Sequence, residues 1–63
     1  MYFQLMYHTI NREYHARLYN AAGQLLMWTH SSRDKQVVIN WCWEVKRAGI
    51  DVNTPIYDAK SYS

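Results

Sequence analysis

The sequence predicts an α+β fold in which a three-stranded antiparallel β-meander packs on one α-helix, in the order βββα. Three observations support this prediction. Apolar and polar residues alternate through residues 1–30, Gly23 stands where a hairpin would turn, and the segment that follows has apolar residues at helical spacing between capping residues. The chain of 63 residues has no repeat or linker, so we expect one domain over residues 1–63.

The first two strands are expected at about residues 1–9 and 13–21, joined by a short polar loop. Their buried row consists of Phe3, Leu5, Tyr7, Tyr14, Ala16 and Leu18. An antiparallel register through this loop places Tyr2 opposite Tyr19, Gln4 opposite Arg17 and Met6 opposite His15. The two strands therefore leave a second face that is rich in rings.

A third strand is expected at about residues 24–30, after a hairpin loop at positions 22 and 23. Gly23 readily takes the positive φ angle that a two-residue loop needs, but Ala22 suits such a turn poorly, so a longer bulged loop is the alternative. The buried row gains Leu25 and Met27 from this strand. The two-residue loop would set Arg17 opposite Trp28, Tyr19 opposite Leu26 and His15 opposite His30.

A helix is expected at about residues 33–48. Ser31 or Ser32 can cap its first amide groups, Asp34 favours its positive end, and Gly49 can end it. Its apolar stripe consists of Val37, Val38, Trp41, Val45 and Ala48, with Cys42 at the margin. Ile39 and Trp43 lie almost opposite this stripe, so we expect them outside the core.

The tail, residues 50–63, contains one proline and no helical stripe. Ile56 and Tyr57 are expected to form a short edge strand or a packed extension, because Pro55 is tolerated at the start or edge of a strand. The last four residues are expected to fray.

Several motifs carry a resemblance to a known family. These are F-x-L at Phe3 to Leu5, the run YHARLYNAAGQLL, and the helix leading through Val45 to PIYD. In these motifs the chain resembles the YegP-like family of small uncharacterised bacterial proteins, although Ala22 stands where an Asn-Gly turn is usual and the helix carries Trp41-Cys42-Trp43. The resemblance implies a compact unit of sheet and helix, sometimes present as tandem copies or dimers, and implies no activity.

Composition and charge narrow the functional classes. The formal net charge of +2 is spread along the chain, which is too mild to indicate a dedicated nucleic-acid-binding protein. A single cysteine fits a reducing compartment, and no apolar run of signal-peptide or membrane length occurs. We therefore expect a cytoplasmic protein that does not engage a membrane.

Catalysis, a metal and a cofactor are not expected. Cys42 could act as a nucleophile if a histidine lay beside it in the fold. A thiol at the flank of a core stripe is more often an inert packing group. His15 and His30 could together bind a transition metal, yet no spacing supplies a third ligand, and solvated histidines on a sheet are the favoured interpretation.

Two surfaces are predicted to bind a partner. The sheet surface contains Tyr2, Arg17, Tyr19 and Trp28, and the helix surface contains Ile39 and Trp43 with Lys46 and Arg47 at its rim. Interface cores are enriched in such aromatic and arginine side chains. We expect protein–protein contacts, including a homodimer through one surface, as in a phage-type or accessory inhibitor of a larger complex. The alternative is a module that stacks single-stranded nucleic acid on the outer sheet face.

Overall fold

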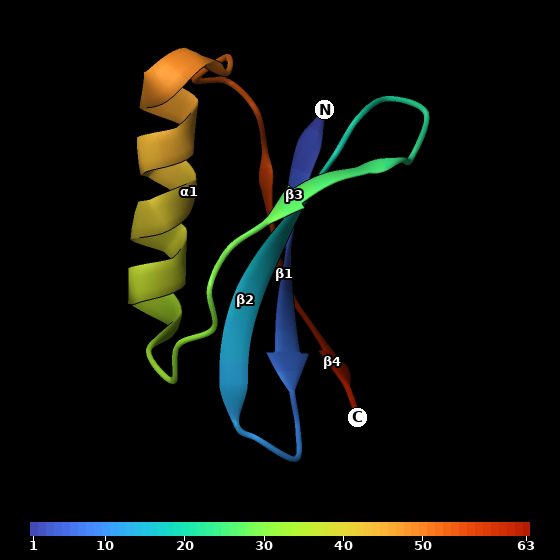
Figure 1. Ribbon diagram of the computed structural model, residues 1–63, viewed down its shortest axis with the longest axis vertical. Coiled ribbons are helices and arrows are strands. Elements are labelled where there is room, and N and C mark those ends of the chain that lie inside the picture. Colours follow the sequence, from blue (N-terminus) through green and yellow to red (C-terminus); the bar gives the residue numbers. More distant parts are fainter.

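A four-stranded mixed sheet with one helix beside it forms the protein, as described for all residues from Met1 to Ser63 by a computed structural model (Figure 1). The elements are β1 (Tyr2–His8), β2 (Glu13–Tyr19), β3 (Leu25–Trp28), α1 (Lys35–Gly49) and β4 (Ile56–Tyr62). The strand order is β3-β2-β1-β4, and β4 runs parallel to β1. The predicted α+β arrangement of three antiparallel strands followed by a helix is therefore confirmed, and the tail adds a full strand.

The register of β1 on β2 is the predicted one. Tyr2 pairs with Tyr19, Gln4 with Arg17 and Met6 with His15. The loop between the strands closes with a hydrogen bond from the Arg12 amide to the His8 carbonyl oxygen at 2.8 Å, and Arg12 has a φ angle of 56°. Period-two alternation places the apolar rows of both strands on one face, and the four-residue loop at residues 9–12 fixes the register.

The hairpin between β2 and β3 takes the longer, bulged form. The Asn20 side-chain oxygen accepts hydrogen bonds from the amides of Ala22 and Gln24, both at 2.9 Å, while Gly23 adopts a φ angle of 80°. An irregularity in the pairing makes Leu25, rather than Leu26, the partner of Tyr19.

Three expectations about the third strand are wrong. Because the extra residue shifts the alternation by one, Leu25 is exposed on the face opposite the core instead of joining Met27. The pairing of Arg17 with Trp28 is as expected, but regular pairing stops there, so His15 and His30 do not face each other. The strand is also shorter than residues 24–30.

Helix α1 begins at Lys35, about two residues later than expected from a cap at Ser31 or Ser32. Its N-cap is Asp34, whose carboxylate accepts the Gln36 amide at 2.9 Å, and Ser32 supports the cap by accepting the Asp34 amide at 3.1 Å. The helix includes Gly49 and ends with a hydrogen bond from the Ile50 amide to the Lys46 carbonyl oxygen. Side-chain capping thus satisfies amide groups that the helix itself cannot.

The buried stripe of α1 differs from the predicted one. Its buried residues are Val38, Cys42 and Lys46, whereas Ala48 is exposed. The stripe is rotated by about one residue position, ~100° around the axis, toward the side that carries Ile39. On that side of the helix, Ile39 and Lys46 face the chain that enters β4, the strand that extends the sheet beyond β1.

The core lies between α1 and the inner face of the sheet. It consists of Phe3, Leu5, Ala16, Leu18, Val38 and Cys42. With so few sealed side chains, the domain depends on partly buried rings at its margins for the rest of its packing. Helix α1 is neither long nor apolar enough to cross a membrane.

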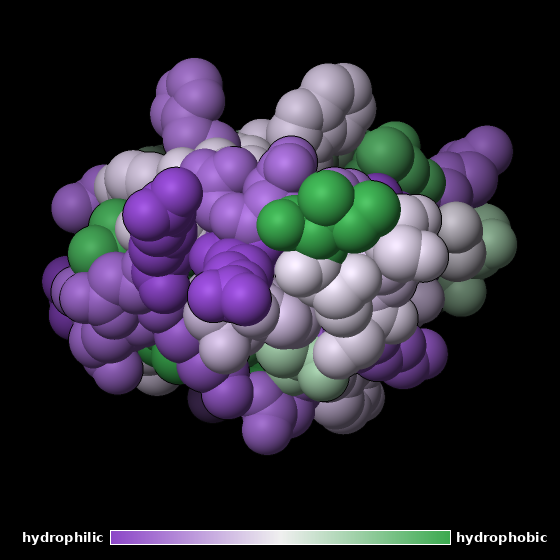
Figure 2. Space-filling model, turned by 90° about the horizontal axis from the view of Figure 1, so that it is seen from below, coloured by the Kyte–Doolittle hydropathy of each residue, from purple (hydrophilic) through white to green (hydrophobic).

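The end of the molecule that carries the β1–β2 loop is mostly hydrophilic, with apolar atoms in small separate groups (Figure 2). Ile10, in that loop, is among the most exposed apolar side chains. Scattered exposed apolar residues are ordinary on a protein surface. Candidate binding surfaces are therefore better sought on the sheet and along the helix.

Candidate functional site

The face of the sheet that α1 does not cover carries a row of tyrosines at one end. The rings of Tyr2 and Tyr19 stack with centroids 5.3 Å apart, and Tyr57 of β4 meets Tyr2 edge-on at 5.6 Å. We call this side of the sheet the outer face. Its members are Tyr2, Gln4, Met6, His8, Glu13, His15, Arg17, Tyr19, Leu25, Trp28, Tyr57, Lys60 and Tyr62.

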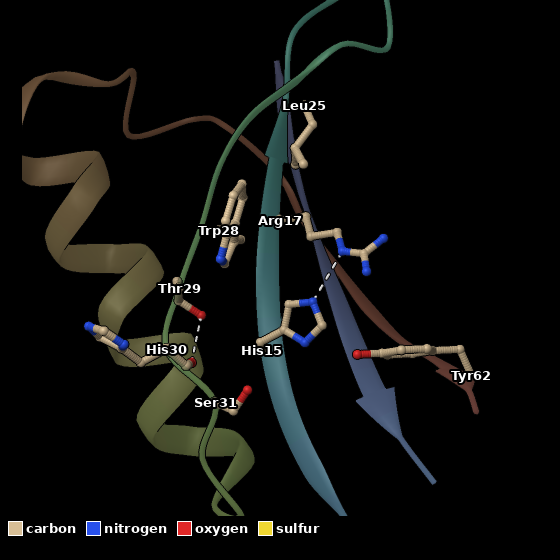
Figure 3. A pocket seen from close by; sticks show the side chains of 8 residues that line it. All are labelled: His15, Arg17, Leu25, Trp28, Thr29, His30, Ser31 and Tyr62. Atoms are coloured by element: carbon tan, nitrogen blue, oxygen red, sulfur yellow. Dashed lines mark hydrogen bonds between the residues drawn. The ribbon is translucent and has the colours of Figure 1, made fainter. Parts of the chain in front are cut away.

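Arg17 is the centre of the other half of the outer face. Its Nε donates a hydrogen bond to His15 Nε2 at 3.1 Å, and its guanidinium carbon lies 5.6 Å from the centroid of the Tyr62 ring. Tyr62 also meets the rings of His8 and His15 edge-on, at 4.9 and 5.9 Å. Figure 3 shows Arg17 and His15 extending from β2 toward the side of the sheet where Tyr62 lies. These contacts hold the arginine in one orientation.

An open depression of about 640 Å³ surrounds this arginine. Arg17, His15 and Tyr62 line one part of it, and Trp28 with Ser31 lines another (Figure 3). Trp28 is 67% exposed, so its ring is largely free to contact a partner. The depression thus offers a cation, hydroxyl groups and exposed ring surface together.

The electrostatics of the depression depend on His15 and Arg17. Burial lowers the pKa of His15 below its ordinary value, and the positive charge of Arg17 and proximity to His8 lower it further. The neutral ring that results can accept the hydrogen bond from Arg17. Arg17 has no carboxylate partner, because the single ion pair of the structure joins Lys35 and Asp58.

The predicted sheet residues Tyr2, Arg17, Tyr19 and Trp28 do share one surface, but sequence reasoning missed Tyr57 and Tyr62. Positions five apart lie on opposite faces of a regular strand. In β4 an extra residue falls between the pairs Gln4–Tyr57 and Met6–Lys60, so both tyrosines reach the outer face. The aromatic content of the tail was the one signal that could have indicated this role.

The predicted helix surface is not a separate patch. Ile39 packs against the core, and Lys46, expected at the rim, is 4% exposed. Trp43 is 39% exposed, with Lys46 Nζ 3.8 Å and Arg47 Cζ 6.0 Å from its ring centroid. The segment that leads into β4 accounts for the difference, since Thr54, Pro55 and Ile56 line a groove together with these helix residues.

The residues considered for catalysis and metal binding lie apart. Cys42 is fully buried, and burial raises the pKa of its thiol to about 11, so the thiolate is scarce at neutral pH. The ring centroid of His30 lies 6.1 Å from that of Trp41, on the helix side of the sheet. Figure 3 shows the His30 side chain directed away from His15. No group of three or more His, Cys, Asp or Glu side chains comes together as a metal site would require.

Comparison with family models, with curated proteins and with solved structures finds no match to this chain. The resemblance to the YegP-like family stays a prediction from the sequence motifs. What the protein does must therefore be argued from its own surfaces.

Proposed function

We propose that the protein is a non-enzymatic binding domain that contacts another protein through the outer face of its sheet. The observation that carries this proposal is the cluster of rings around Arg17 on the face that no helix covers. Tyrosine, tryptophan and arginine dominate the binding energy of protein interfaces, with individual side chains contributing about 2 kcal/mol or more. A reducing cytoplasm, which suits the single thiol, is the proposed compartment.

The partner surface is expected to be acidic around Arg17. Arg17 and Lys60 are cationic members of the outer face, and Glu13, paired with His8 at its margin, is the opposing charge. A partner carboxylate could accept hydrogen bonds from the free guanidinium nitrogens of Arg17, whose Nε is already held by His15. A second copy bound through the same face would bring two such arginines toward each other, so we favour a different protein over the homodimer.

Single-stranded nucleic acid is the second candidate for the outer face. The stacked Tyr2–Tyr19 pair and an arginine without a carboxylate partner are the observations that favour it. Each base that stacks on an exposed ring contributes about 1 to 3 kcal/mol of binding free energy, and the phosphates would pair with Arg17.

Two variants test the proposal. Trp28→Ala removes an exposed ring, and Arg17→Met removes the charge while keeping the stem. Ile10→Ala, an exposed apolar change outside the outer face, is the matched control. Affinity capture from the native host should recover a partner protein with the wild type and with Ile10→Ala, but not with Trp28→Ala or Arg17→Met. Trp28→Ala should change the free energy of unfolding by about 0.5 kcal/mol or less.

The same variants separate the alternatives. Salt-sensitive quenching of tryptophan fluorescence by short single strands, lost in Arg17→Met, would instead support nucleic acid. Sedimentation of the purified protein as a dimer that Trp28→Ala dissociates would instead support a second copy as the occupant. A partner captured equally by the wild type and both variants would rule out the outer face.

A further inference from the structure

A groove between α1 and the chain that enters β4 is a second place where a ligand could bind. It has a volume of about 520 Å³, within the range of small-molecule sites, and is open to solvent. Helix residues line one wall and tail residues the other, with Leu5 of β1 between them. The walls include Ile39, Trp43, Lys46, Thr54, Pro55 and Ile56.

Lys46 is the unusual member of this groove. Its side chain is 4% exposed and has neither an ion pair nor a hydrogen bond; its ammonium nitrogen lies 3.8 Å from the Trp43 ring centroid. Every side-chain nitrogen or oxygen that is fully sealed from solvent has a hydrogen-bond partner. Because the ammonium group of Lys46 has none, it must reach water, and it does so through the groove that it lines. The Trp43 ring is the only partner of this cation, and an anion in the groove would supply the counter-charge that it lacks.

The other cation of the groove is already neutralised. Lys35 forms an ion pair with Asp58, and this contact raises the pKa of Lys35 and lowers that of Asp58. One positive charge, that of Lys46, remains without a counter-charge among these lining groups. A single negative charge on the ligand would balance it.

The walls beside Lys46 favour a small molecule with an apolar body over a peptide. Ile39, Pro55 and Ile56 are apolar, and Trp43 presents part of its ring. Several backbone groups of the tail wall, the Asn53 amide among them, are already hydrogen-bonded within the chain and do not offer themselves to a peptide main chain. The Pro55 carbonyl accepts the Phe3 amide, and the Thr54 amide donates to the Asp51 carbonyl.

We propose that this groove binds a small monocarboxylate with an apolar chain, its carboxylate on Lys46 and its chain against Ile39, Pro55 and Ile56. The Thr54 hydroxyl, on the same wall, supplies a further hydrogen-bond donor. The site is separate from the outer face, and it does not depend on what binds there.

Hexanoate and hexanol, which share an apolar chain and differ in charge, are the probes. In amide and indole NMR spectra of the wild-type protein, hexanoate should give saturable shifts at Ile39, Trp43 and Thr54, with affinity at least about tenfold above that for hexanol. Lys46→Met keeps the stem and should abolish this preference. Arg47→Met removes a cation that contacts Trp43 but does not line the groove, and it should keep the preference.

Thermal melting distinguishes a ligand site from a structural lysine. Without ligand, Lys46→Met should melt close to the wild-type temperature, because removal of a nearly buried cation offsets the loss of its contact with Trp43 and of its charge in the last helical turn. Equal shifts from hexanoate and hexanol in the wild-type protein would overturn the proposal without any variant. A hexanoate preference that persists in Lys46→Met, or a marked fall in its melting temperature, would also overturn it.

Discussion

His15 shows how one side chain sets the state of its neighbours on the outer face. Its ring is buried against Tyr62 and accepts a hydrogen bond from Arg17, which requires an unprotonated Nε2. Protonation would replace this bond by repulsion between two cations. Burial, Arg17 and His8 all favour the neutral ring and thereby lower the pKa of His15.

The lowered pKa of His15 predicts that stability rises with pH. Below its ordinary value of 6.5, the unfolded chain binds a proton that the folded chain resists, so stability is lost as the pH falls from 6.5 through the folded-state pKa. Melting temperatures at about pH 5 and about pH 7.5 would measure the effect. His15→Gln can still accept a hydrogen bond from Arg17 but cannot titrate, so it should show a smaller difference. An unchanged difference would contradict this origin.

Helix α1 shows how local signals at the ends of an element decide its limits. Asp34 accepts the Gln36 amide, and Ser32 accepts the Asp34 amide, so two polar side chains order the entry to the helix. At the other end, Lys46 and Arg47 lie in the last turn, where cations interact favourably with the helix dipole.

Removal of the N-cap should therefore destabilise the protein. Asp34→Ala leaves an amide of the first turn without its side-chain partner and should lower the free energy of unfolding by about 1 kcal/mol. Urea denaturation measures this change. Gln36→Ala removes only an exposed side-chain contact with Asn40 and is the control. Equal effects of the two substitutions would show that the cap contributes no more than an exposed side-chain contact.

The elements that sequence reasoning located correctly are those with a strong local signal. Alternation and the short first loop together predict the pairing of Tyr2 with Tyr19 and Met6 with His15, because a slip by one residue would expose the whole apolar row and the loop length excludes larger slips. The predicted orientation of α1 was wrong because its buried face carries a charged residue. Helical periodicity ranks faces by apolar content, and Lys46 counts as polar although its long apolar stem suits it to packing.

Candidate site residues on β1 and β2 were found because regular strands make their faces readable. Tyr57 and Tyr62 escaped this reasoning because a bulge in β4 breaks the alternation. Leu25 was misplaced by the bulge in β3 for the same reason. A bulge depends on which strand lies alongside, and the parallel partner of β4 was not predicted from sequence.

On the scale of the whole molecule, β4 makes β1 an interior strand. Parallel pairing joins Phe3 to Ile56 and His8 to Tyr62, and the Phe3 amide donates to the Pro55 carbonyl at 2.9 Å. Ile56 and Ala59 pack against the core from this strand. In so small a domain, β4 thus contributes to the sheet, the core and both candidate sites.

A chain that ends at Pro55 should accordingly lose its cooperative structure. Truncation of residues 56–63 unpairs one edge of β1 and exposes Phe3 and Leu5, which are sealed in the full chain. Thermal melting by circular dichroism should show a much lower or broader transition than the full chain. Removal of Ser63 alone, which follows β4, is the control. A truncated chain with the wild-type transition would show that β4 is dispensable.

The parallel pairing of β1 with β4 also has a consequence for biosynthesis. Strand β4 is synthesised after the other strands of the sheet and pairs with β1, so the nascent chain cannot complete this sheet while residues 56–62 are still in the exit tunnel. Contacts between such distant segments slow folding, because a long loop must close before they form. During that interval the free edge of β1 would be exposed to neighbouring chains, and chaperones could act there.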